Sequence, residues 1–215
     1  SITAKRNHII EYFKEGALVV EIDDDVDDIV HFSKHLDDEL RPDGSHKIIY
    51  TKTPLHLKYN SFYRFMDECF ADPEVKLWAC CCNDNPFFGL RGDQKGIQLK
   101  SLHGGIFGYR NDHRIKLTLQ EKEDFERVIK YYDMGKITLK RTDFGVKTKC
   151  WTNKGGIQAK YDKTERMKVQ MAMANRLVEL YPLYVTKKVR KNGLADIVFK
   201  RTRGLNKMCP LNKVD

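Results

Sequence analysis

The sequence lacks several features that would assign it to common protein classes. No apolar run approaches the ~20 residues that a bilayer-spanning helix needs, and no secretory signal is visible. The cysteines do not show the C-x-x-C spacing of a zinc site, and there are no internal repeats or low-complexity tracts. The glycines match no Walker-type or Rossmann pattern. These absences argue against membrane-spanning, zinc-ribbon and repeat proteins.

The composition is that of a folded globule. The chain has 215 residues, with 41% hydrophobic and 11% aromatic residues, which is enough for one domain with a sizeable core. Three of the six cysteines are adjacent, Cys80 to Cys82, within an apolar run, so we expect them to be small buried hydrophobes in a strand. Reduced thiols fit the cytoplasm, which would be the host-cell cytoplasm for a viral protein. The chain begins at Ser1 rather than Met, and we expect it to be the C-terminal part of a longer protein.

Charge is distributed unevenly along the chain. The whole sequence has a net charge of +9, yet residues 1–45 hold 5 basic and 12 acidic residues, a net of −7. Residues 135–215 hold 20 basic and 6 acidic residues. This asymmetry predicts an acidic, metal-binding end and a basic surface for a polyanion such as nucleic acid or, less readily, a sugar-nucleotide diphosphate. The alternative is a lysine-rich solvated surface.

The most informative segment is Ala17–Val26. Its apolar, Val- and Ile-rich start predicts a buried strand, and three carboxylates, Asp23, Asp24 and Asp25, follow at the end of that strand. Adjacent carboxylates repel one another, so a fold that keeps them together usually supplies a cation, hydrogen bonds or solvent. Hard oxygen ligands suit Mg²⁺ or Mn²⁺, which commonly bridge carboxylates to a diphosphate. A solvated acidic turn is the alternative interpretation.

A second acidic site is Glu123-Asp124. The pattern Thr118-x-x-Glu121 is typical of a capping box and predicts a helix that begins there, with Gly135 at its end. Carboxylates in a first helical turn are stabilised by the helix dipole, so a purely structural role is plausible. A carboxylate fixed at that position is also suited to act as a general base toward an acceptor hydroxyl.

A third candidate is a glycine-containing basic loop, Thr152–Ile157. Exposed backbone N–H groups and nearby cations would form an anion pocket suited to a diphosphate, although a flexible surface loop is equally consistent with the pattern. The candidate anion contacts are Lys154, Lys160 and Arg166. His103, which precedes two glycines, is a candidate for the acceptor site or a structural histidine.

The remaining pattern predicts alternating helices and strands. Helices are expected over 3–13, over 59–70, and from an Asp162-x-x-Glu165 cap to Pro182. Residues 27–45 are expected to be acidic and polar up to a turn at 42–44. Strands are expected over 47–51, 78–82, 97–109 (interrupted at 103–105), 137–139 and 197–199, with a loose basic tail over 204–215.

Taken in order, these segments resemble a known family. A helix with Lys5-Arg6-Asn7, the strand with Asp23-Asp24-Asp25, and Glu123-Asp124 at a later helix start resemble a GT-A glycosyltransferase. The closing pattern of a Gly-Gly loop, a basic helix and Tyr181-Pro182 is similar to the TET/JBP-associated glycosyltransferases of phages and eukaryotes. Those enzymes are thought to add sugars to hydroxymethylated pyrimidines in DNA.

The resemblance implies a GT-A-like three-layer α/β sandwich with a mixed central sheet, lacking its N-terminal nucleotide-binding strands. This domain would occupy residues 1–203. The implied activity is metal-dependent transfer of a sugar from a nucleotide-sugar, such as a UDP-sugar, to a hydroxyl. Asp23 and Asp25 would hold Mn²⁺ or Mg²⁺, and Arg6 and Asp24 would assist at the donor. Asp124 would be the base, with Glu123 beside it.

Two other functions remain open on the same residues. A metal-dependent nuclease or phosphodiesterase would use the same aspartates and need no sugar donor. A non-catalytic nucleic-acid-binding module would bind in a salt-dependent way and ignore divalent metal. The sequence leaves the oligomeric state undetermined.

Overall fold

The computed structural model describes residues 1–59, 61–90, 92, 94–102, 105–148, 163–191 and 193–200. The helices there are α1 (Ile2–Tyr12), α2 (Leu55–Lys58), α3 (Phe62–Phe70), α4 (Pro86–Gly89), α5 (Glu123–Asp133) and α6 (Lys163–Leu180). The strands are β1 (Leu18–Ile22), β2 (Val26–Leu40), β3 (His46–Pro54), β4 (Val75–Cys81), β5 (Gln94–Gly96), β6 (Ile106–Arg110), β7 (Ile137–Thr148), β8 (Val185–Val189) and β9 (Ala195–Phe199). The expected mixed α/β fold is confirmed.

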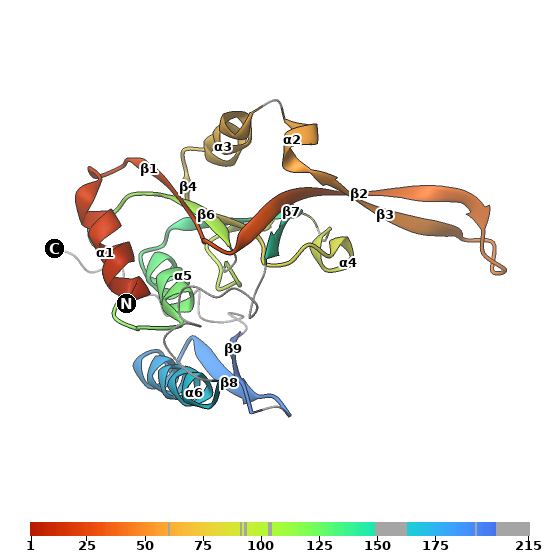
Figure 1. Ribbon diagram of the computed structural model, residues 1–215. Helices are drawn as coiled ribbons and strands as arrows, with labels where there is room; N and C mark the ends of the chain where they lie inside the picture. The colour runs from red at the N-terminus through yellow and green to blue at the C-terminus, as the bar shows by residue number, and fades with distance from the viewer. Residues whose placement is uncertain are drawn as a thin grey trace.

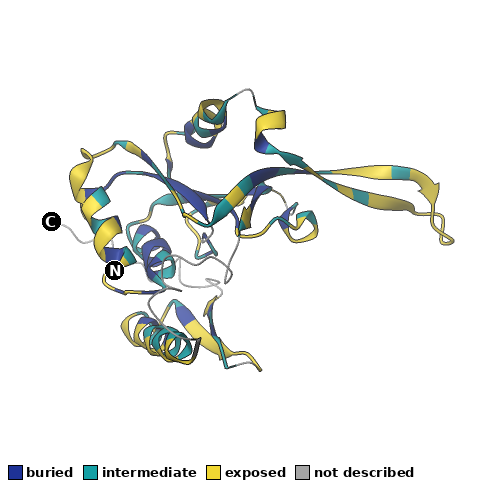
Figure 2. Ribbon diagram, viewed as in Figure 1, coloured by how far each residue is buried: buried dark blue, intermediate teal, exposed yellow. Residues whose placement is uncertain are grey.

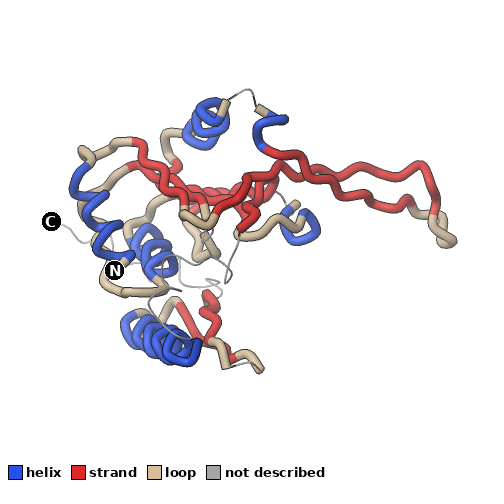
Figure 3. Tube along the Cα trace, viewed as in Figure 1, coloured by secondary structure: helices blue, strands red, loops and turns tan. Residues whose placement is uncertain are grey.

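One seven-stranded mixed sheet organises the molecule (Figures 1 and 3). Its order is β1-β6-β4-β7-β2-β3, and β5 pairs with β7. Strand β6 is antiparallel to both β1 and β4, while β4 and β7 are parallel. The C-terminal ends of β1, β4 and β7 therefore meet the start of β6 at one edge of the sheet. The three aspartates follow β1 at this edge.

Helices cover both faces of the sheet, with α1 and α5 on one side and α2 and α3 on the other (Figure 1). The α1/α5 face buries aliphatic residues from α1, β1, β4 and α5 together with Tyr109 and Tyr131. The α3 face is strongly aromatic, and its central buried rings are Phe65, Phe70, Trp78 and Phe144. The sheet thus separates two cores of different chemistry.

Strands β2 and β3 form a long hairpin that extends away from the sheet (Figure 1), and its outer part is exposed on both strands (Figure 2). Strand β2 also pairs with β7, but only from Val26 to His31. The sequence predicts the turn at 42–44 correctly, and Gly44 adopts a φ of +79° there. It does not predict β2, because the outer part of the strand is polar on both faces and lacks the alternation that marks a half-buried strand.

The predicted capping box at Thr118 is wrong. Helix α5 begins at Glu123, and its N-cap residue is Lys122 in a left-handed conformation without a side-chain cap. Thr118 donates instead to the fully buried Glu126, both from its backbone N–H and from its hydroxyl. The acidic partner of Thr118 is therefore eight residues away rather than three, so a tertiary contact replaces the local one.

Three further expectations are only partly met. The strand expected over 97–109 is β6 alone, at 106–110, and β5 lies before it. Cys80 and Cys81 are buried as expected, but Cys82 is exposed because it lies just beyond the last residue of β4. The strand expected at 137–139 is confirmed but continues to 148.

A smaller unit packs on the outer side of α5. Helix α6 and the β8–β9 hairpin share a core with residues of α5, and its fully buried members include Ile129, Leu177 and Val185. The helix ends before Pro182, as the sequence predicts. Asp162 and the tail 204–215 lie outside the described residues. None of the helices in the described ranges combines the length and apolar character needed to cross a lipid bilayer.

Candidate active site

The aspartate turn is held in place at the edge of the sheet by its contact with Gly105. The Asp23 N–H donates to the Gly105 carbonyl at 2.8 Å, and the Val26 N–H donates to the Asp23 carbonyl at 3.2 Å. A Cβ at Gly105 would lie 2.2 Å from Val26 Cγ2, so only glycine permits this approach. His103 and Gly104 lie outside the described residues.

Arg6 is the centre of the site. It is buried on α1, with 5% of its surface exposed. Its Nη2 lies 3.2 Å from Asp23 Oδ1, its Nε lies 3.2 Å from Glu21 Oε2, and its Nη1 donates to Glu123 Oε1. The guanidinium therefore joins β1, the turn after it and the start of α5. Residues that are a hundred positions apart in the sequence meet at this one side chain.

Helix α1 is attached to the segment before α5 by residues on either side of Arg6. Asn7 makes a pair of hydrogen bonds with the backbone of Leu117, donating to its carbonyl at 2.8 Å and accepting from its N–H at 2.9 Å. The Thr3 hydroxyl donates to the Leu119 carbonyl. These contacts fix where α5 starts relative to β1, and therefore fix the distance between the two acidic segments.

Glu123 and Asp124 lie in the first turn of α5, where the helix dipole favours negative charge. Glu123 is buried, and burial together with the neighbouring charge of Asp124 raises its pKa to about 7. The charge of Arg6 opposes this rise in the pKa without cancelling it, because the effect of burial is larger. Asp124 is half-buried, and its Oδ1 accepts the Phe125 N–H at 2.9 Å.

Two residues of this site, Glu21 and Arg127, were not predicted from the sequence. Glu21 accepts from the Tyr109 hydroxyl at 2.9 Å and lies 3.5 Å from Arg127 Nη2. The Arg127 guanidinium lies over the Phe107 ring, 4.3 Å from its centroid. A signal for Glu21 was available: it is two positions after the buried Val19, so it lies on the inward face of β1.

The cluster carries an excess of negative charge. Two guanidiniums, Arg6 and Arg127, face four carboxylates, from Glu21, Asp23, Glu123 and Asp124. Burial raises the pKa of Asp23, the nearby charge of Asp25 adds to the rise, and Arg6 opposes it. The Asp23 side chain is still 41% exposed, so solvent weakens these effects. A proton or a divalent cation would relieve the excess.

A divalent ion at the aspartate turn would have to take most of its ligands from elsewhere. Among the described residues, no group of three or more His, Cys, Asp or Glu side chains is placed to hold a metal ion by itself. Asp23 and Asp25 are neighbours on one turn and supply hard oxygen donors. Mg²⁺ is commonly bound by one or two carboxylates, with substrate phosphates and water completing the shell. Asp24, on the same turn, is exposed.

Of the three predicted basic contacts, Arg166 is the one that lies within the described residues. Lys154 and Lys160 lie outside the described residues. Arg166 is on α6. Burial raises the pKa of the Glu121 carboxyl, and the positive charge of Arg166 opposes this rise. Glu121 is two positions before Glu123, so the start of α6 lies near the acidic end of α5.

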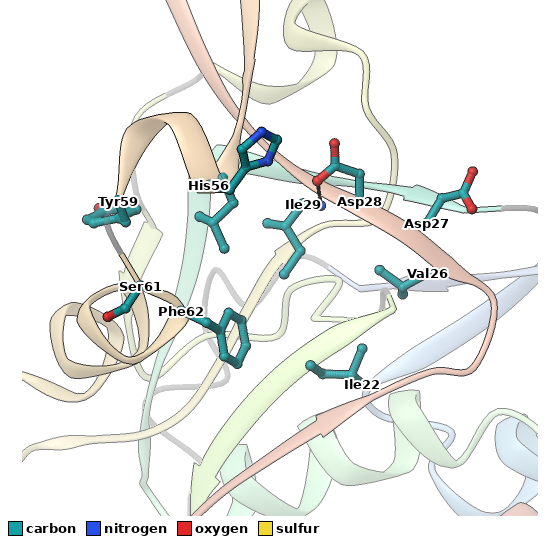
Figure 4. A pocket seen from close by; sticks show the side chains of 10 residues that line it. Ile22, Val26, Asp27, Asp28, Ile29, His56, Tyr59, Ser61 and Phe62 are labelled. Carbon is teal, nitrogen blue, oxygen red and sulfur yellow. Dashed lines mark hydrogen bonds between the residues drawn. The ribbon is translucent and has the colours of Figure 1, made fainter.

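A cavity of about 500 Å³ lies on the α3 side of the sheet, next to the aspartate turn (Figure 4). Ile22 and Val26, which flank the turn, form one wall, and α2 and the start of α3 form the other. The lining residues are Ile22, Val26, Asp27, Asp28, Ile29, Leu55, His56, Tyr59, Ser61 and Phe62. This cavity could not be predicted from the sequence, because its two walls come from segments some thirty residues apart.

Comparison with known proteins adds no assignment to this geometry. No protein-family model matches the chain. A search of curated proteins and a search of solved structures likewise find no match.

Proposed function

We propose that this protein is a metal-dependent glycosyltransferase that moves a sugar from a nucleotide-sugar to a hydroxyl acceptor. The observation that carries the proposal is the contact of Arg6 with both Asp23 and Glu123. Asp23 and Glu123 thereby share one guanidinium, which supports the proposal, because the GT-A resemblance implies that the metal-binding aspartates and the Glu123-Asp124 pair belong to the same site.

In this proposal Asp23 and Asp25 hold Mn²⁺ or Mg²⁺, and Asp24 assists at the donor. The bound ion would stabilise negative charge on the departing diphosphate. Arg6 fixes the positions of Asp23 and Glu123 relative to each other, and Glu123 in turn orients the Arg6 side chain. Asp124 takes the proton of the acceptor hydroxyl, and Oδ2 is the oxygen for this role, since Oδ1 accepts a backbone N–H.

The acceptor in this proposal is carried by a polyanion, with hydroxymethylated DNA as the first candidate. Exposed cations on the α6–β8–β9 unit support it, among them Lys187 and Lys188 on β8 and Arg190 and Lys191 in the turn that follows. Contacts of such residues with phosphates dominate the affinity of proteins for DNA and make it depend on salt.

The test is a transfer assay with UDP-sugars, Mn²⁺ and duplex DNA that contains hydroxymethylated pyrimidines, read by the mass of the DNA. Asp25→Asn should abolish transfer, and Asp124→Asn should lower its rate by about 10²–10⁴-fold. Asp43→Asn is the matched control, because Asp43 is exposed in the β2–β3 turn and bonds only with Ser45 among the contacts described. Transfer at the wild-type rate by Asp25→Asn would refute the proposal.

The same reactions separate the other two functions. Cleavage of the DNA with Mn²⁺ in the absence of any sugar donor would identify a nuclease. Binding that weakens with salt but is unaffected by Mn²⁺ and by Asp25→Asn, without any reaction, would identify a binding module.

A further inference from the structure

The outer part of the β2–β3 hairpin presents apolar side chains to solvent on one of its faces (Figure 2). The register pairs Leu36 with Ile48 and Leu40 with His46, and Tyr50 lies two positions from Ile48 on β3. Alternate residues of a strand share a face, so these side chains lie on the same face of the hairpin. Leu36 is 63% exposed, Leu40 58% and Ile48 42%. Large apolar side chains gathered on one exposed face indicate a surface that another molecule covers.

This face continues onto helix α4 at the base of the hairpin. Phe32 is buried there, and a Cβ at Gly89 would lie 2.5 Å from its ring. Phe32 pairs with Lys52, two positions from Tyr50, so Tyr50 lies on the α4 side. The Tyr50 ring meets the exposed Phe87 ring of α4 edge-on, with the ring centroids 6.0 Å apart. The exposed side chains of this face, which we name the hairpin stripe, are Leu36, Leu40, Ile48, Tyr50 and Phe87.

The opposite face of the outer hairpin is more polar. Ser33 and Thr51 bond to each other there through their hydroxyls at 2.7 Å, and the exposed His35 pairs with the half-buried Ile49. Beyond His31, β2 no longer pairs with β7, so the described part of the outer hairpin is a two-stranded ribbon. Such a ribbon is at best marginally stable in water when nothing packs on it. A partner on the hairpin stripe would supply the missing layer.

The distribution of charge along the hairpin favours a second copy of this chain as that partner. Lys34 pairs with Tyr50, so it shares the face of the hairpin stripe and lies at its inner end. At the outer end, residues 37–39 are all acidic, and residues 37–47 together hold four acidic and two basic residues. These carboxylates would repel nucleic acid and anionic lipid. A copy that runs in the opposite direction would bring its acidic end to Lys34, where the two charges attract.

We propose that the hairpin stripe is the interface of a homodimer in which two hairpins stack face to face and antiparallel. A two-fold axis beside Leu36 would pack Leu36 against its own copy and bring Lys34 of each chain to residues 37–39 of the other. The outer Leu40 of one chain would then reach Phe87 of the other. Parallel stacking would instead place the two acidic ends together, where they repel.

The strength of this dimer follows from its size. One face of a two-stranded ribbon with part of α4 is smaller than the roughly 800 Å² that each partner buries in a standard interface, so we expect dissociation in the micromolar range. Sedimentation equilibrium of the wild-type chain over about 1–200 µM measures it. The mean mass should rise with concentration from the 25.2 kDa of one chain toward that of two. A chain that stays monomeric throughout would overturn the inference.

Two neighbouring positions of β2 provide a variant and its matched control. Leu36→Glu places two carboxylates against each other at the two-fold axis and should raise the dissociation constant at least about 100-fold. His35→Glu changes the preceding residue, which is exposed on the opposite face, and should change the dissociation constant by less than about threefold. Equal weakening of the dimer by both variants would contradict the face assigned to the interface.

A charge swap tests the antiparallel direction. Lys34→Glu should weaken the dimer about tenfold, because the new carboxylate meets the acidic segment of the partner, and Asp38→Lys/Glu39→Lys should weaken it similarly by facing Lys34. The chain with all three changes should recover the wild-type dissociation constant. All three positions are exposed, so the fold should be retained. A triple variant that dimerises no better than Lys34→Glu would overturn the proposed arrangement.

A lipid surface is the other partner that an exposed apolar stripe can take. Cosedimentation with phosphatidylcholine vesicles should leave the wild-type chain in the supernatant, because the dimer covers the hairpin stripe and carboxylates border it. Binding to vesicles that Leu36→Glu abolishes and His35→Glu does not would assign the hairpin stripe to a membrane surface and overturn the homodimer.

Discussion

The two faces of the central sheet are both buried, but they are stabilised by different chemistry. The α3 face consists of packed aromatic rings around Phe65 and Trp78. The α1/α5 face places two guanidiniums and several carboxylates against its aliphatic core. Burying charges costs several kcal/mol per ion, which pairing only partly offsets, whereas burying rings is favourable in itself. We therefore expect the aromatic face to contribute more to stability than the charged face, which carries the site of the proposed activity.

Truncation of Arg6 should have the largest effect. Arg6→Met leaves Glu21 and Glu123 without their shared cation, so we expect a loss of about 3–5 kcal/mol in the free energy of unfolding. Lys5→Met, at an exposed position of the same helix, should change it by less than about 0.5 kcal/mol. Urea denaturation followed by circular dichroism measures both.

Neutralising the four most buried charged side chains of the cluster should reverse this loss. The quadruple variant Arg6→Met/Glu21→Gln/Glu123→Gln/Arg127→Met removes two cations and two carboxylates together, and we expect it to be as stable as the wild type or more so. If the quadruple variant is as unstable as Arg6→Met, the charged face contributes to stability and the contrast between the two faces is lost.

The pH dependence of stability should come from the charged face. In the folded state the pKa of Glu123 is raised to about 7, so its stabilising contribution is complete below pH ~4.5 and is lost as the pH rises through 7. Glu123→Gln should therefore gain stability relative to the wild type between pH 5 and pH 8, by up to about 3 kcal/mol. Urea midpoints at pH 5, 6, 7 and 8 test this, and a difference that does not change with pH would contradict it.

A substitution in the aromatic face should lower the free energy of unfolding by an amount that does not depend on pH. Phe65 is fully buried and contacts the Trp78 and Phe144 rings, so Phe65→Leu leaves a partly filled space. We expect a loss of about 1–2 kcal/mol that is the same at pH 5 and pH 8, since no titratable group of the charged cluster is touched. Thermal unfolding at the two pH values provides the comparison.

Divalent metal should act on the charged face alone, with the smallest effect. Millimolar Mn²⁺ should raise the melting temperature by a few degrees through preferential binding to the folded state. The rise should be larger at pH 8 than at pH 5, because protonation of the raised Asp23 and Glu123 carboxyls competes with the cation. Asp25→Asn should abolish the rise, and Phe65→Leu should keep it. An equal rise in Asp25→Asn would place the ion elsewhere.

The sequence predicted the elements whose signals are local. The helix at 3–13, the strand before Asp23 and the helix that ends at Pro182 have periodic apolar residues or clear stop signals, and all three are found. Strands β2 and β8 depend on pairing with other strands, and the start of α5 depends on Glu126, which accepts hydrogen bonds from Thr118 and from Tyr181. Such contacts cannot be predicted from a short window of sequence.

The candidate site likewise contains residues that the sequence predicted and residues that were found in the structure alone. Runs of carboxylates at 23–25 and 123–124 are visible in the sequence because adjacent like charges are unusual beside apolar segments. That Arg6 joins them, that Glu21 and Arg127 complete the cluster, and that a cavity opens behind Ile22 were decided by the tertiary structure alone. The physical reason is that charge and hydrophobicity belong to residues, whereas burial, shared cations and cavities belong to the arrangement of elements far apart in the chain.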